Sequence, residues 1–128
     1  MRADRSRAPE LKEMIRGGAH RVRTGAFEVG AMDIPGARVV WCRGELDISS
    51  EEEVVAEIAR ALGAPVTSIV LDLRGLSFAD WTVIRCIQYA AAASEKCHVT
   101  LYVDAGEIVR KLAQTLSPEE LGAAQAYL

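Results

Sequence analysis

The chain has 128 residues, of which 50% are hydrophobic, and its formal net charge is −3. This composition excludes disorder over the whole length, and three cysteines are too few for a disulfide-rich scaffold. No apolar run approaches the roughly 20 residues that span a bilayer, and the first residues do not resemble a secretory signal. We therefore expect a cytoplasmic protein of one domain, with no membrane insertion.

The charge is divided unevenly along the chain. Residues 1–24 contain seven Lys or Arg and three acids, whereas residues 25–128 contain eight and fifteen. The sequence therefore predicts a basic, flexible or loosely docked N-terminal arm over 1–24 and a folded domain over 25–128. Because this domain is acidic, direct binding to nucleic acid is not expected.

The first part of the domain is predicted to be a β-hairpin followed by a helix. Segments 26–34 and 37–43 are rich in strand-forming residues and are separated by the turn signal Pro35-Gly36. Ser49 and Ser50 then precede three glutamates, which is typical of a capping box. The apolar spacing predicts a helix over 51–62.

Strands and helices alternate in the rest of the domain. An apolar run predicts a buried strand over 66–73, and Asp80 is the expected N-cap of a second helix. A strand over 98–103, a helix over 105–114 and a short helix after Ser117 follow. The order is β-β-α-β-α-β-α-α, which predicts an α/β fold with a mixed sheet.

The sequence offers no constellation for catalysis or metal binding. Cys42, Cys86 and Cys97 lack metal-ligand spacing, and His20 and His98 lie far apart. There is no glycine-rich phosphate loop. We therefore expect no enzymatic activity, no metal and no cofactor.

Two loops are candidates for a binding site. Residues 44–47 follow the second predicted strand, and residues 78–83 follow the third. The carboxyl ends of strands are where open α/β sheets usually place their sites.

These loops resemble those of a known family. Gly44-Glu45-Leu46-Asp47-Ile48, the run from Ile69 to Asp80 and the final segment from Val103 to Leu116 are similar to a STAS domain, the domain of bacterial anti-sigma factor antagonists. The resemblance covers roughly residues 25–128. It implies a single domain with a sheet of four to five strands and helices packed mainly on one face.

The resemblance also implies a function in transcription regulation by partner switching. Such a domain binds an anti-sigma factor, often a serine/threonine protein kinase, and is released when it is phosphorylated. Thr82 matches the phosphoacceptor of the family motif Asp-Ser-Ser/Thr-Gly, and Asp80 matches its aspartate. The expected partner-binding and switch residues are Glu45, Asp47, Asp80, Trp81 and Val83.

Two positions depart from the family pattern, since Trp81 replaces a serine and Val83 replaces the glycine. Two interpretations of Thr82 therefore stay open. Either a specialised kinase phosphorylates an exposed Thr82 hydroxyl, or the domain is a degenerate scaffold that binds partners without phosphorylation. For Trp81 the alternatives are contact with a partner and packing against the domain, and for Asp47 they are switching and ordering of its own loop.

Two further expectations concern partners. An accessory subunit of a membrane lipid transporter is the alternative function, because small STAS-type subunits of that kind exist. A homodimer is also expected, through an exposed edge strand at 26–34.

Overall fold

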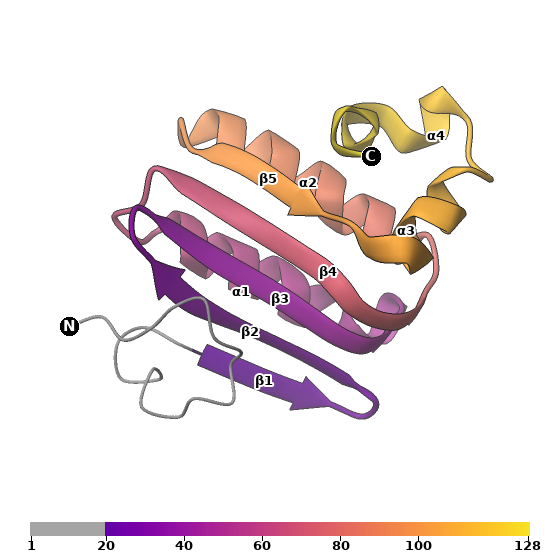
Figure 1. The fold of residues 1–128 in the computed structure, drawn as a ribbon, viewed down its shortest axis with the longest axis horizontal. Helices are drawn as coiled ribbons and strands as arrows, with labels where there is room; N and C mark the ends of the chain where they lie inside the picture. The colour runs from indigo at the N-terminus through magenta and orange to yellow at the C-terminus, as the bar shows by residue number, and fades with distance from the viewer. Residues whose placement is uncertain (1–19) are drawn as a thin grey trace.

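The computed structural model describes residues 20–128, which fold into a five-stranded sheet with helices (Figure 1). The strands are β1 (His20–Thr24), β2 (Phe27–Ile34), β3 (Ala37–Leu46), β4 (Ser68–Ala79) and β5 (Thr100–Asp104). The helices are α1 (Glu51–Leu62), α2 (Thr82–Lys96), α3 (Gly106–Ala113) and α4 (Pro118–Leu121), with 3-10 turns η2 (Ile48–Ser50) and η3 (Gly122–Tyr127).

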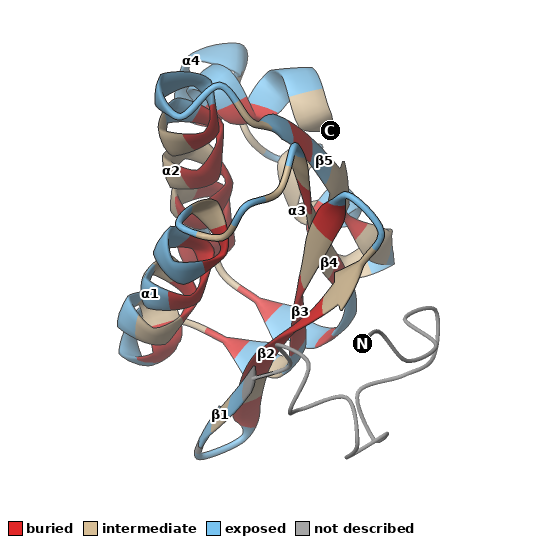
Figure 2. Cartoon of the chain, turned by 90° about the vertical axis from the view of Figure 1, so that its left-hand side faces the viewer, coloured by how far each residue is buried: buried red, intermediate tan, exposed pale blue. Residues whose placement is uncertain are grey.

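The sheet is mixed, as the sequence predicts. Its order is β1-β2-β3-β4-β5, with antiparallel pairing from β1 to β3 and parallel pairing from β3 to β5. The hairpin at Pro35-Gly36 is confirmed, and Gly36 takes a φ of 77°, which a glycine adopts without steric cost. Helices α1 and α2 lie side by side on one face of the sheet (Figure 2).

The hydrophobic core fills the space between this face and the two helices. Val54 and Ile58 of α1 and Ile87 of α2 are fully buried there, against Ile69 and Leu71 of β4. These residues recur at helical spacing in α1 and α2 and at every second position in β4, so the apolar pattern in the sequence decides which faces meet. Among the described residues, no helix is long and apolar enough to cross a membrane.

The start of the domain differs from the prediction. Residues 20–24, assigned to the basic arm, form β1, which pairs antiparallel with β2. Alternating charged residues are common on edge strands, where they discourage further pairing. Strand 26–34 is therefore flanked on both sides, and the expected dimer through its free edge is wrong. The remainder of the predicted arm, residues 1–19, lies outside the described residues.

Strand β4 is longer than predicted and continues to Ala79 rather than ending at residue 73. It follows β3 along its whole length, so that Ala79 pairs with Leu46. Gly75 permits this close approach, because a Cβ there would lie 2.9 Å from Arg43 Cγ and 3.0 Å from the Cys42 carbonyl oxygen. The two candidate loops consequently begin side by side.

The helix starts agree with the sequence in one case and differ in the other. At α4, the Glu120 amide donates to Ser117 Oγ (3.1 Å) and the Ser117 amide donates to Glu120 Oε1 (2.7 Å), which confirms the expected cap. Before α1, Ser50 makes no side-chain cap for that helix. The capping side chain is that of Asp47, which precedes η2.

Candidate functional site

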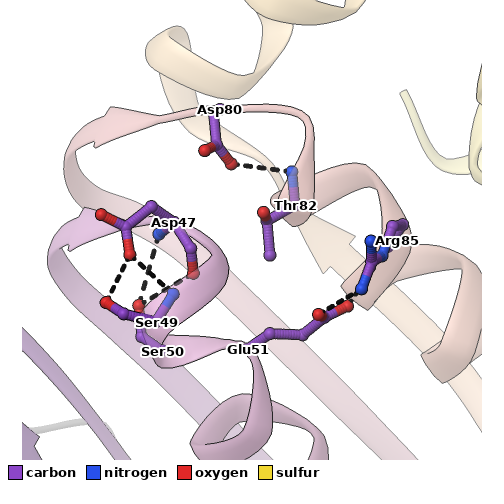
Figure 3. Close-up of polar contacts among 7 residues, drawn as sticks. All are labelled: Asp47, Ser49, Ser50, Glu51, Asp80, Thr82 and Arg85. Atoms are coloured by element: carbon purple, nitrogen blue, oxygen red, sulfur yellow. Dashed lines mark hydrogen bonds and ion pairs between the residues drawn. The ribbon is translucent and has the colours of Figure 1, made fainter.

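Two loops meet where β3 and β4 end (Figure 3). The Asp80 amide donates to the Leu46 carbonyl oxygen across 3.3 Å, so the second loop is held against the first by the backbone. Asp47 and Asp80 come directly after the paired residues Leu46 and Ala79. The structure thus brings together the two aspartates that the sequence places 33 positions apart.

The first loop is ordered by Asp47 and two serines. One carboxylate oxygen of Asp47 accepts hydrogen bonds from the Ser49 hydroxyl (2.6 Å) and the Ser49 amide (2.9 Å). The Asp47 amide donates to Ser50 Oγ, 3.3 Å away. The hydrogen bond from the Ser49 side chain, followed by that from its amide, holds the pKa of the Asp47 carboxyl below its usual value. Asp47 therefore has the loop-ordering role that was one of its two predicted roles.

In the second loop, Asp80 accepts a hydrogen bond from the Thr82 amide at 2.8 Å. This contact satisfies one of the free N–H groups at the start of α2. The N-cap position itself is Trp81, whose side chain makes no cap, so the capping hydrogen bond comes from Asp80, one residue earlier. The Thr82 side chain turns inward between the first loop and the start of α1 (Figure 3). Thr82 is only 1% exposed. The prediction of an exposed hydroxyl is therefore wrong.

The neighbours of Thr82 have opposite environments. Val83 is completely buried in the core below α2, so its side chain offers no surface to a partner. Trp81 is 54% exposed and Glu45, at the end of β3, is also exposed. Of the predicted contact residues, Glu45, Asp47, Asp80 and Trp81 remain accessible on this edge of the sheet, whereas Val83 is a core residue.

Arg85 joins the second loop to the first helix, and sequence reasoning did not single it out. Its Nε donates to Glu51 Oε2 at 2.8 Å, and a second hydrogen bond joins Nη2 to Oε1. Its guanidinium also lies over the Trp81 ring, 4.8 Å from the ring centroid. Because Glu51 and Arg85 are 34 positions apart, no local pattern could have revealed this pair.

Sequence reasoning also missed two exposed apolar side chains at these loops. Ile48 follows Asp47, and Phe78 lies two residues before Asp80; they are 61% and 49% exposed. Together with Trp81 they form what we call the apolar rim, consisting of Ile48, Phe78 and Trp81. Large exposed apolar side chains near polar groups are typical of protein-binding surfaces.

The described residues do not provide the groups needed for metal or thiol chemistry at this site. They contain no cluster of three His, Cys, Asp or Glu side chains able to hold a metal ion. Cys42 and Cys86 are buried. Burial raises the pKa of the Cys86 thiol to about 12 and that of Cys42 well above its usual value, so both are unreactive thiols at neutral pH.

A family model of the STAS domain matches residues 30–117. The chain belongs to the STAS domain family. No curated relative matches the sequence.

Three solved structures with a STAS-like fold are similar to this chain. SpoIIAA, an anti-sigma factor antagonist in its unphosphorylated form, has a TM-score of 0.54 and 18% identity, over 87% of this chain and 99% of its own. An anti-sigma factor antagonist from Mycobacterium paratuberculosis has a TM-score of 0.58 and 16% identity, over 79% and 93% of the two chains. The murine anion transporter Slc26a9 has a TM-score of 0.60 and 20% identity, over 75% of this chain.

These likenesses establish the STAS fold. The chain spans nearly all of the two antagonists, but only 16% of the transporter and 20% of another similar structure, Mglu. The STAS fold thus occurs both as a separate chain and as part of longer proteins.

Proposed function

We propose that this STAS domain is a non-enzymatic, cytoplasmic anti-sigma factor antagonist that binds an anti-sigma factor with serine/threonine kinase activity. The observation that carries the proposal is the apolar rim, Ile48, Phe78 and Trp81, beside the acidic residues Asp47 and Asp80 at one edge of the sheet. A partner that covers the rim would bury apolar area, and its cationic groups would pair with the carboxylates.

Phosphorylation of Thr82 is the proposed release step. SpoIIAA, which shares the fold, also has a phosphorylated form. In that step the Thr82 oxygen attacks the γ-phosphorus of ATP bound to the kinase, ADP leaves, and the hydroxyl proton passes to a base of the kinase. The product carries about −1.5 to −2 charges at neutral pH.

The surroundings of Thr82 explain how one phosphate would release a partner. Because Thr82 is buried, a phosphate cannot occupy its closed position, and the start of α2 has to open to accommodate it. The carboxylates of Asp80 and Glu51 would repel the phosphate. The Arg85 guanidinium would bind the phosphate in place of Glu51. Loss of the Arg85–Glu51 pair would also displace Trp81, which rests on Arg85 and belongs to the apolar rim.

The test is to incubate the protein with ATP and the anti-sigma kinase of the same cell, and to map phosphate by mass spectrometry. Thr82→Val, which keeps the shape of the side chain, serves as the matched control. Phosphate at Thr82 in the wild type and none in the variant would support the proposal. Binding without any phosphate would leave the alternative of a non-phosphorylated scaffold.

A second function is favoured by one observation, the similarity to a domain within the anion transporter Slc26a9. This chain would then be an accessory subunit of a membrane transporter, such as a lipid-transport ATPase. Binding studies with the two purified partner types distinguish the functions. An accessory subunit should bind the transporter ATPase and not the anti-sigma kinase, and its affinity should not depend on ATP-dependent phosphorylation of Thr82.

A further inference from the structure

The sheet face opposite α1 and α2, which we call the outer face, carries a continuous row of large apolar side chains. In the strand register, Met32 pairs with Val39, Val39 with Val70, and Val70 with Tyr102. Directly paired residues point to the same side of a sheet, so these four residues form one row across β2 to β5. None of the four belongs to the hydrophobic cluster beneath the helices, although Met32 is only 4% exposed.

A second row lies beside the first on the same face. It contains Arg21, Gly30, Trp41, Asp72 and Asp104, again in direct register from β1 to β5. Trp41 is 5% exposed and carries the Arg43 guanidinium over its ring, 4.8 Å from the centroid. Tyr102 is 58% exposed. The accessible apolar part of the outer face therefore lies toward β5.

The charges of the outer face have opposite signs at its two sides. On β1 and β2, Arg21 and Arg23 outnumber Glu28, which pairs with Arg21 at 3.2 Å. On β4 and β5, Asp72 and Asp104 outnumber Arg74, which pairs with them at 3.0 and 3.2 Å. One side of the face thus has a surplus positive charge and the other a surplus negative charge.

We propose that the outer face binds a second copy of this chain, related by a two-fold axis that runs parallel to β3. This rotation places β1 over β5 of the second copy, so the basic side of each sheet meets the acidic side of the other. A two-fold axis across the strands would place β1 over β1 and bring like charges together. The charge distribution therefore selects one of the two symmetric face-to-face arrangements.

The same rotation gives specific pairs between the two copies. Within the second row, Arg21 lies opposite Asp104 of the second copy, and Trp41 lies over its own counterpart. Within the apolar row, Met32 lies opposite Val70 of the second copy. Side chains of these lengths can meet across two aligned sheets, which pack about 10 Å apart.

The area of the outer face predicts a reversible dimer. Five strands spaced about 4.8 Å apart, with about eight residues rising 3.3 Å each, present roughly 600 Å² per copy. Because Met32 and Trp41 are already largely buried within the chain, the area that a dimer buries is smaller than this and falls below that of standard-size interfaces, so the dimer is expected to be weak. Of the apolar rim, Phe78 lies at the end of β4 on this side of the sheet, whereas Ile48 and Trp81 lie in the loops beyond the strands. The dimer does not depend on the proposed antagonist function.

The test is sedimentation equilibrium of the full chain over a wide concentration range, with single and double charge reversals. Arg21→Glu and Asp104→Arg should each weaken the dimer by roughly tenfold, and the double variant should regain most of the wild-type affinity. Tyr102→Glu should also weaken it, whereas Ile48→Glu, in the loop after β3, should not. Thermal unfolding of each variant confirms that the fold is retained.

Three results would overturn the proposal. The first is a wild-type chain that stays monomeric at every concentration. The second is a double variant whose dimer is no tighter than the dimer of either single variant. The third is cross-linking of residues 1–19 to Tyr102 within the same chain, which would assign the outer face to that segment.

Discussion

Arg85 of α2 forms a two-point ion pair with Glu51 of α1, and this pair joins the first turns of two helices that follow neighbouring strands. Thr82 lies one turn before Arg85 and is almost completely buried. The ion pair lies beside Thr82 (Figure 3). Together with the Trp81 ring, which lies against the Arg85 guanidinium, it is placed to control access to the proposed phosphoacceptor.

The first prediction concerns this control of access. In a Cys97→Ser background, which removes the exposed native thiol, Thr82→Cys should react slowly with a maleimide. Adding Arg85→Met should accelerate the reaction about fivefold, because losing a partly exposed ion pair lowers the free energy of local opening by about 1 kcal/mol. Arg74→Met, which breaks a distant pair on the outer face, is the control. If the proteins that carry Arg85→Met and Arg74→Met react with the maleimide at equal rates, Arg85 does not restrict access to residue 82.

The second prediction concerns Trp81 as a contact for the proposed partner. Trp81→Ala should weaken binding to the anti-sigma kinase by about 2 kcal/mol, roughly thirtyfold, because exposed tryptophans often dominate interfaces. Its free energy of unfolding should change by less than about 1 kcal/mol, since half of the side chain is already in water. Isothermal titration calorimetry measures the affinity, with Tyr102→Ala on the outer face as the matched control. A variant that binds like the wild type would mean that Trp81 lies outside the interface.

The third prediction concerns Val83, which stands where the resemblance to the family motif implies a glycine. Val83→Gly should lower the free energy of unfolding by about 2 to 4 kcal/mol, because it leaves a cavity in the core and places a flexible residue in the first turn of α2. Chemical denaturation monitored by circular dichroism measures the loss. Val83→Ile, which keeps the site filled, should cost less. A neutral Val83→Gly variant would place this side chain outside the core.

The fourth prediction follows from the lowered pKa of Asp47. Its stabilisation is complete above the ordinary value of 3.8 and is lost as the pH falls below that value toward the lowered folded-state pKa. Asp47→Asn should therefore reduce the loss of stability between about pH 4 and pH 2. Comparing urea unfolding of the two proteins over this range measures the difference, with Glu95→Gln, an exposed carboxylate at the far end of α2, as the control. If the free energy of unfolding falls equally with pH in the wild type and in Asp47→Asn, the stabilising role of the Ser49 hydrogen bonds is contradicted.

Much of the fold was predictable because each element has its own local pattern. The apolar spacing in 51–62 and the cap at Ser117 specify helices without reference to the rest of the chain. Strand β1 was missed because its basic residues suggest an arm, and only the register with β2 makes it a strand. The length of β4 depends on its pairing with β3 up to Leu46, which again is not a local property.

The candidate site was predictable only in its location. The carboxyl ends of β3 and β4 indicated which loops would meet, and Asp47 and Asp80 were identified correctly as residues of those loops. The burial of Thr82 had one signal, since it lies four residues before the buried Cys86 and thus on the same side of α2. The Glu51–Arg85 pair had none, because it depends on how two helices pack.

The burial of Thr82 also changes how a phosphate mimic should be interpreted. Thr82→Glu would bury a carboxylate, which costs several kcal/mol unless the start of α2 opens. Such a variant could lose a partner through local unfolding alone. Enzymatic phosphorylation of the native threonine avoids this ambiguity.

The central claim is that a phosphate on Thr82 releases a partner bound to the apolar rim. The most direct measurement is calorimetric titration of the anti-sigma kinase, held without ATP, with the protein before and after enzymatic phosphorylation at Thr82. The account predicts tight binding before phosphorylation and a loss of at least about 3 kcal/mol, more than a hundredfold, afterwards. Equal affinities of the two forms, with phosphate confirmed on Thr82, would contradict it.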